Sequence, residues 1–149
     1  MFTIENVETN IDPMIFLPIW LIIIAIGLVG YILNAVALST MAKNAGISRP
    51  WLAWIPVANV WIMGELVTDR LRGNGGFKYI IITLIYILVC WIPFVNAIAG
   101  MAYGIFSILV LYWLYEKYSN KPVLHTVFSI IIPIYSVICL FVIRNNEEY

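Results

Sequence analysis

The sequence predicts an all-α integral membrane protein, a single domain over residues 1–149 that forms a four-helix bundle with an additional short re-entrant or interfacial segment. Hydrophobic residues make up 63% of the chain and charged residues only 11%, and the mean hydropathy is +0.97. Soluble domains are about half apolar and about a quarter charged, so this composition does not suit a water-exposed surface. Charge-free stretches separate Asp12 from Lys43, Lys78 from Glu116 and Lys121 from Arg144. Each is longer than the roughly 20 residues that a helix needs to cross a bilayer.

The first crossing is predicted for residues 14–41. Asp12 can cap this helix, and Pro13 suits the first helical position, where its missing N–H costs nothing. The stretch exceeds one crossing, so we expect the helix to tilt or to protrude. The last crossing is predicted for residues 123–143, and we expect Pro133 to kink it because proline removes a backbone hydrogen bond.

The middle stretch must hold two helices. A single helix over its whole length would be about 55 Å long, far more than the membrane thickness. Pro93, Asn96 and Gly100 cluster within it and predict a turn. We therefore predict crossings at residues 78–95 and 97–115.

The segment 51–66 is apolar but short for a crossing, and Pro56 interrupts it. Its tryptophans favour the headgroup boundary. We therefore expect it to be re-entrant or to lie on the surface of the membrane. A crossing here would separate Lys43 and Arg49 from the basic residues that follow and would largely remove the charge bias described next.

Basic residues predict the topology. With four crossings, residues 42–78 and 116–121 lie on one side of the membrane and contain all but one of the eight basic residues. The positive-inside rule makes this side cytoplasmic, which leaves both termini outside the cytoplasm. The predicted basic cytoplasmic face comprises Lys43, Arg49, Arg70, Arg72 and Lys78. It is either a solvated rim of weak ion pairs or a docking patch for anionic lipids or a cytosolic partner.

Two six-residue segments are nearly alike, residues 54–59 (WIPVAN) and residues 91–96 (WIPFVN), and Ile132-Pro133 is a weaker third copy. Proline leaves a backbone carbonyl without its partner, and a nearby asparagine can supply a donor or end the helix. The motif residues are Trp54, Pro56, Asn59, Trp91, Pro93 and Asn96. They represent either two similar helix breaks or an internal duplication.

These residues, together with Ala45 and Gly46 before the first copy, resemble a pattern found in small multi-pass bacterial membrane proteins of unknown function. The family signature pairs two aromatic-Ile-Pro-x-x-Asn motifs, one in an A-G…W-x-A-x-I-P-x-x-N segment after the first crossing and one after the next crossing. The resemblance covers about residues 31–106. It implies a bacterial cell membrane location and offers no catalytic residues to transfer.

Small residues form two predicted stripes for helix packing or partner contact. The first stripe comprises Gly27, Gly30, Asn34 and Ala37, and the second Gly100, Gly104 and Ser107. Small side chains let helix backbones approach closely in lipid. The stripes pack either within the bundle or against another subunit.

The predicted crossings contain no motif for chemistry. They lack the interior carboxylates and cations of ion-coupled transporters and proton pumps. His125, the only histidine, is interpreted as a polar boundary residue; a pairing with Ser107 or Ser129 for nucleophilic catalysis is disfavoured. Cys90 and Cys139 have no metal-binding spacing. We therefore predict no catalytic, cofactor or metal site.

The favoured function is that of a non-enzymatic subunit or accessory factor of a membrane complex. The alternative is a small channel or carrier for a neutral or lipophilic solute. A lipid-processing enzyme or a membrane immunity protein ranks last. The expected partners are the lipid bilayer and another membrane protein or a second copy of the chain; the neutral net charge gives no reason to expect nucleic acid.

Overall fold

The computed structural model describes residues 16–146, and within them the chain is helical and contains no β-strand. The elements are α1 (Leu17–Asn44), the 3-10 helix η2 (Pro50–Trp54), α2 (Ala58–Leu66), α3 (Gly75–Val89), α4 (Pro93–Tyr118), α5 (Pro122–Ile131) and α6 (Pro133–Ile143). The predicted all-α class is confirmed. Two helices, α1 and α4, are long and apolar enough to cross a membrane. The predicted helix start at Asp12 and Pro13 lies outside the described residues.

The break between the two middle helices comes earlier than predicted. Helix α3 ends at Val89, and α4 begins at Pro93, so the predicted boundary between residues 95 and 97 is wrong. Pro93 occupies the first turn of α4, where its fixed φ and missing N–H are tolerated. Ile92 before it is extended (φ −97°, ψ 111°), as expected for a residue that precedes proline.

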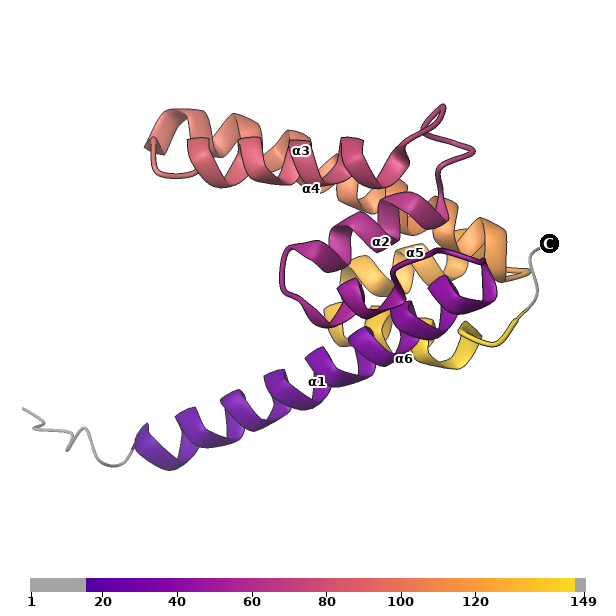
Figure 1. Ribbon diagram of the computed structural model, residues 1–149. Coiled ribbons are helices and arrows are strands. Elements are labelled where there is room, and N and C mark those ends of the chain that lie inside the picture. Colours follow the sequence, from indigo (N-terminus) through magenta and orange to yellow (C-terminus); the bar gives the residue numbers. More distant parts are fainter. Residues whose placement is uncertain (1–15, 147–149) are drawn as a thin grey trace, which may run out of the picture.

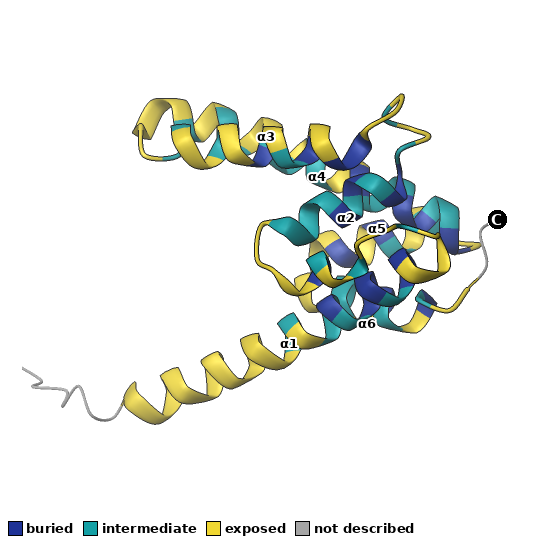
Figure 2. Ribbon diagram, viewed as in Figure 1, coloured by how far each residue is buried: buried dark blue, intermediate teal, exposed yellow. Residues whose placement is uncertain are grey.

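Buried residues gather where α2, α5 and α6 meet the C-terminal halves of α1 and α4 (Figure 2). Two arms leave this centre (Figure 1): the N-terminal half of α1 and the outer part of the α3–α4 hairpin. Residues 17–29 are all exposed, and Trp91 and Phe94 at the end of the hairpin are 85% and 90% exposed. The outer surfaces of both arms are therefore apolar and uncovered.

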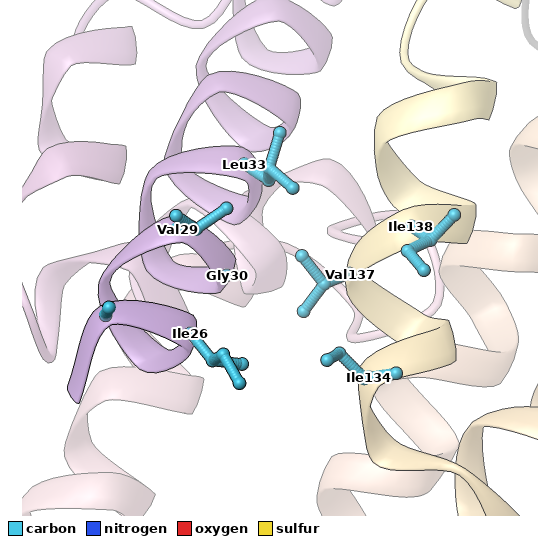
Figure 3. Close-up of a pocket in the computed structure, with 8 residues that line it drawn as sticks. Ile26, Val29, Gly30, Leu33, Ile134, Val137 and Ile138 are labelled. Atoms are coloured by element: carbon cyan, nitrogen blue, oxygen red, sulfur yellow. The ribbon is translucent and has the colours of Figure 1, made fainter. Parts of the chain in front are cut away.

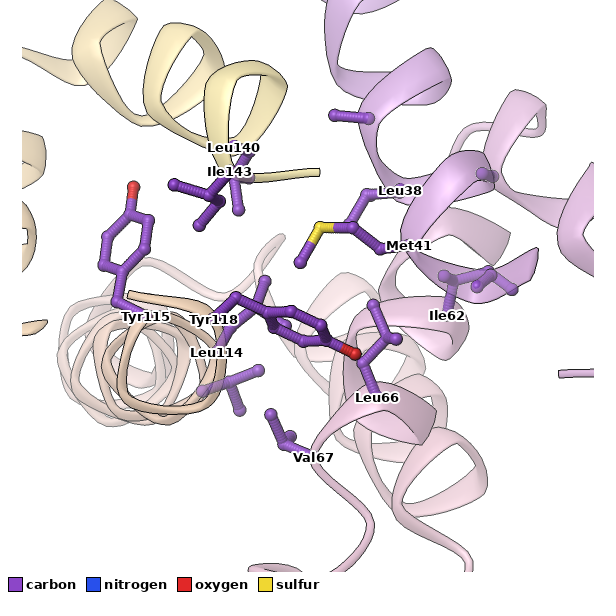
Figure 4. Close-up of a cluster of buried hydrophobic side chains, with 14 of the residues drawn as sticks. Leu38, Met41, Ile62, Leu66, Val67, Leu114, Tyr115, Tyr118, Leu140 and Ile143 are labelled. Carbon is purple, nitrogen blue, oxygen red and sulfur yellow. The ribbon is translucent and has the colours of Figure 1, made fainter. Parts of the chain in front are cut away.

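The centre of the bundle is filled by side chains from four helices (Figure 4). The largest fully buried ones are Leu38 and Met41 of α1, Ile62 and Leu66 of α2, and Leu114, Tyr115 and Tyr118 of α4. Leu140 and Ile143 of α6 close the cluster from the other side. This packing fixes the end of the bundle where loops join α1 to η2, α2 to α3 and α4 to α5. We call it the connected end.

The chain reverses direction between α5 and α6. Each helix is about 15 Å long, so a continuous kinked helix would carry the end of α6 about 30 Å from the start of α5. Instead, Asn146 Nδ2 donates to the carbonyl of Tyr118 at 3.0 Å, four residues before α5 begins. Asn44 Nδ2 donates to the carbonyl of Arg144 at 3.3 Å. The expected single kinked helix over residues 123–143 is therefore wrong: Pro133 opens the second arm of a helical hairpin.

Helix α6 runs in the same direction as α1 along its side. In Figure 3, Ile134 lies opposite Ile26 and Val137 points toward α1, so the start of α6 lies beside the middle of α1. The tip of the α5–α6 hairpin thus ends halfway along α1. The described C-terminal end lies with the helix connections, contrary to the predicted placement of both termini opposite them.

Candidate functional site

Each Ile-Pro dipeptide lies at a helix boundary. Ile55, Ile92 and Ile132 have extended backbones, with ψ values of 123°, 111° and 92°. The ring of the following proline disfavours the helical conformation at these positions. The dipeptide therefore lies between two helices at each of the three sites, and at Ile92 and Ile132 the following helix turns back along the preceding one.

The first copy of the motif divides segment 51–66 into η2 and α2. Val57 has φ +70° and ψ −45°, and Ala58 N donates to the carbonyl of Pro56 at 2.9 Å, which closes a tight γ-turn. A positive φ is strained for a β-branched residue. Because of this turn the tryptophans of the segment do not share one continuous helix. Tyr31 of α1 donates a hydrogen bond to the carbonyl of Trp54 and holds the end of η2 in place.

The second copy joins α3 and α4. Asn96 lies within α4, and its side-chain oxygen accepts a hydrogen bond from Tyr86 of α3 at 3.5 Å. Asn96 therefore does not end a helix, which was one of its two expected roles. Tyr86 also stacks on Tyr103 of α4, with ring centroids 4.6 Å apart. These contacts hold the two helices of the hairpin together.

The α5–α6 hairpin is held closed by polar side chains. His125 Nδ1 lies 2.7 Å from the hydroxyl of Tyr135, which links α5 to α6. The hydroxyls of Tyr115 and Ser129 lie 2.9 Å apart and link α4 to α5. Ser129 donates to the backbone carbonyl of His125 at 2.7 Å. The thiol of Cys139 on α6 lies beside the hydroxyls of Tyr115 and Tyr135. Polar groups inside the hairpin are therefore paired with one another, as buried polar groups must be.

This geometry bears on the candidate Ser–His pairs. Ser129 is bonded to the backbone of His125 and not to its imidazole. Ser107 lies on α4 and bonds the hydroxyl of Tyr79 on α3 at 3.1 Å. Neither serine is positioned for activation by His125, because a nucleophile must be within hydrogen-bond reach of its base. Among the described residues, no group of three histidine, cysteine or acidic side chains is placed to hold a metal ion.

The glycines of the predicted stripes make few contacts within the chain. A Cβ added at Gly27, Gly30 or Gly104 would meet no atom within 4 Å, and one at Gly100 would come no closer than 3.7 Å, to the hydroxyl of Tyr86. Of the other stripe residues, Ala37 is in the buried core, Asn34 is half-buried and Ser107 bonds Tyr79. Packing within the bundle does not explain the absence of a side chain at the first three positions.

Different glycines bring α2 and α3 together. A Cβ on Gly64 would lie 2.5 Å from the carbonyl oxygen of Gly75, and one on Gly76 would lie 2.6 Å from the carbonyl oxygen of Trp61. The two backbones thus touch without intervening side chains. No periodic pattern along the chain predicts this contact, because the glycines lie at the end of one helix and the start of the next.

The basic residues lie at the connected end of the bundle, in the terminal turns of helices or in the loops between them: Lys43, Arg49, Arg70, Arg72, Lys78, Lys117, Lys121 and Arg144. Arg70 pairs with Glu116 at 2.9 Å. Lys78 Nζ donates to the carbonyls of Leu71 and Arg72 at 2.6 and 3.3 Å. Lys43 and Arg49 are exposed. Since Arg144 joins the others, all eight basic residues share this end.

A polar cleft of about 620 Å³ opens at the same end, between the loop after α1, the end of α2 and the end of α4. Glu65 and Lys117 bring opposite charges to it, and Ser48 and Thr68 bring hydroxyls. Glu65 Oε2 accepts a hydrogen bond from Gly76 N at 3.1 Å. Lys117 Nζ donates to the carbonyl of Leu66 at 3.2 Å. The sequence did not predict this cleft, because its charged residues are far apart in the chain and belong to no motif.

A second cleft, of about 320 Å³, lies between α1 and α6 and is lined by apolar side chains (Figure 3). A third, of about 290 Å³, lies between α3 and α4. Both open on the outer surface of the bundle, outside the filled centre.

Comparison with protein-family models, curated proteins and solved structures finds no match to this chain. The resemblance to small bacterial membrane proteins stays a prediction.

Proposed function

We propose that this protein is a non-enzymatic subunit or accessory factor of a membrane complex, held in the bilayer by three crossings and one re-entrant hairpin. The crossings are α1, α3 and α4. Helix α3 is about 22 Å long, and the turn that follows it extends its reach. Lipid suits the apolar exposed surfaces of both arms, whereas water does not.

The charges support a defined orientation for this arrangement. A re-entrant α5–α6 hairpin brings Arg144 to the side of the other basic residues, so the bias rises from seven of eight to all eight. The positive-inside rule then makes the connected end cytoplasmic. In this proposal the N-terminal end of α1 lies outside the cytoplasm and the end of α6 lies inside.

The main evidence for a partner is the exposed tip of the α5–α6 hairpin. Ile131 and Ile132 at the tip are 68% and 47% exposed in the isolated chain. The last helical hydrogen bond of α5 runs from Ile132 N to Phe128 O, and Pro133 has no N–H with which to continue the series. The carbonyls of the final turn therefore lack helical partners.

Beside the middle of α1, this tip is at the depth of the hydrocarbon. Irregular backbone at that depth is tolerated where protein buries it or where it lines a water-filled cavity, since each unsatisfied polar group in lipid costs several kcal/mol. The isolated chain leaves the tip uncovered. We therefore infer that another polypeptide covers it in the membrane.

The glycines of α1 and α4 support the same conclusion. Gly27, Gly30 and Gly104 have open space around them, so they are available for a close approach by a partner helix. Gly30 and Ile134 line the apolar cleft beside the hairpin tip. The surface around the tip is thus continuous with a helix face that suits membrane packing.

The filled centre of the bundle favours a subunit over a channel or carrier. Leu38, Met41 and Tyr118 are buried where a pathway along the bundle axis would run. Within residues 16–146, neither Ser107 nor Ser129 is placed for activation by His125, which gives no support to a lipid-processing enzyme.

Photocrosslinking in native membranes tests the proposal. A photoreactive residue at Ile132 is expected to give a protein adduct of discrete mass, because the tip is covered. Val142, exposed on the same hairpin but near its cytoplasmic end, is the matched control and is expected to react mainly with lipid. The substitution Gly27→Leu should lower the yield of the Ile132 adduct. Lipid adducts alone at both positions would refute a protein partner at the tip.

A further inference from the structure

The polar cleft at the connected end has the chemistry of a site for a zwitterion. Its volume of about 620 Å³ is within the usual range for ligand sites. Glu65 contributes a carboxylate and Lys117 an ammonium, and hydroxyls of Ser48 and Thr68 line the same space. A ligand that carries both an amine and a phosphate can meet each charge with its opposite.

The carboxylate of Glu65 retains capacity to bind a cation. The ion pairs between described residues join Arg70 to Asp69 and to Glu116, and Glu65 belongs to neither. A carboxylate accepts about four hydrogen bonds, and Gly76 N supplies one of them to Glu65 Oε2. Because Gly76 N and the start of α3 hold this oxygen, the carboxylate is fixed at the wall of the cleft.

The position of Glu65 favours a primary ammonium. Such a group donates charge-assisted hydrogen bonds to a carboxylate, which are about twice as strong as neutral ones. A quaternary ammonium has no N–H to donate. The cationic side of the site is Lys117, a residue type that binds phosphate as a point charge.

We propose that this cleft binds the headgroup of a zwitterionic phospholipid with a primary ammonium, as in phosphatidylethanolamine. Glu65 receives the ammonium, and Lys117 with the hydroxyl of exposed Ser48 receives the phosphate, since the Thr68 hydroxyl already donates to the carbonyl of Gly64. The cleft lies at the cytoplasmic boundary in the orientation proposed above, where such headgroups are found. The inference does not depend on the partner at the hairpin tip, because it can be tested on the purified chain alone.

Native mass spectrometry of the full chain in mild detergent measures this binding. The probes are phosphatidylethanolamine, phosphatidylcholine and phosphatidylglycerol of matched acyl chains. We expect phosphatidylethanolamine to bind about tenfold more tightly than either of the others, as one charge-assisted hydrogen bond allows. Free phosphoethanolamine is a separate arm: displacement of the lipid at equal concentration identifies a soluble source, and displacement only at large excess identifies the lipid.

Two variants test the residues. Glu65→Gln removes the charge but keeps an oxygen for Gly76 N, and it should lower phosphatidylethanolamine binding about tenfold without lowering phosphatidylglycerol binding, because phosphatidylglycerol has no ammonium. The matched control is Glu116→Gln, a carboxylate paired with Arg70 outside the cleft. Ser48→Phe fills the cleft from an exposed loop position and should block binding without disturbing the core.

Equal binding of the three lipids would overturn the proposal. So would equal effects of Glu65→Gln and Glu116→Gln, or an unchanged affinity in Ser48→Phe. Unfolding midpoints of all variants in the same detergent separate loss of the site from loss of the fold.

Discussion

Replacing Gly64 by alanine should separate α2 from α3. The added Cβ would lie 2.5 Å from the carbonyl oxygen of Gly75 and 2.9 Å from Cβ of Tyr79. Neither atom can move without its backbone, so the helices must shift apart. Overpacking costs about 1–3 kcal/mol, and rigid neighbours favour the upper end of that range. The higher helix propensity of alanine raises the free energy of unfolding by about 1 kcal/mol and offsets part of this loss. The net expectation is a loss of about 2 kcal/mol.

Reversible unfolding of the purified protein in mixed micelles, followed by circular dichroism, measures this difference. Gly104→Ala is the matched control, because its Cβ would meet nothing within 4 Å and only the propensity gain of about 1 kcal/mol applies. The two variants are thus expected to change stability in opposite directions. If Gly64→Ala were as stable as Gly104→Ala, the described contact between α2 and α3 would be incorrect.

Three further predictions follow from the same structure. Reporters inserted at Asn74 and fused after Asn146 should label the same side of the membrane; labelling of opposite sides would mean that α5–α6 crosses. Tyr135→Phe removes the hydroxyl bonded to the imidazole of α5 and should cost about 0.5–1.5 kcal/mol in the unfolding assay, because the hydrogen bond is part-buried, and an unchanged stability would contradict it. Leu38→Ala, in the buried core, should cost about 2–5 kcal/mol, whereas Leu28→Ala, 58% exposed on the same helix, should change stability by less than about 0.5 kcal/mol; equal losses would contradict the packing.

The sequence predicts the first helix closely and shows where helices break, because apolar length and proline act locally. The first helix, predicted over residues 14–41, is described over Leu17–Asn44. Pro93 and Pro133 lie at helix starts because proline lacks an N–H, whatever surrounds it. The prediction misses the start of α4 by a few residues, because asparagine and glycine, here Asn96 and Gly100, are common in turns. Both are tolerated inside a helix when neighbouring helices contact them.

The candidate site was less predictable, because it depends on contacts between distant segments. Glu65 and Lys117 line one cleft because α2 packs against α4. Their spacing along the chain does not predict that they lie close together. Gly64 and Gly76 belong to no common helical face, although the structure brings both into the same junction. Local sequence patterns report propensity and amphipathicity, and neither property encodes these contacts.

The reversal at Pro133 was open to inference from charge, although not from local structure. An apolar stretch with a central proline fits a kinked crossing and a hairpin of two half-length helices equally well, because both need the same break. The two alternatives differ in where they leave Arg144. A crossing isolates it from the other seven basic residues, and a hairpin unites all eight at one end, as described here. The positive-inside rule, applied to this choice as it was to segment 51–66, favours the hairpin. That choice also changes the functional argument, since a kinked crossing needs no cover at its centre, whereas a hairpin tip within the hydrocarbon does.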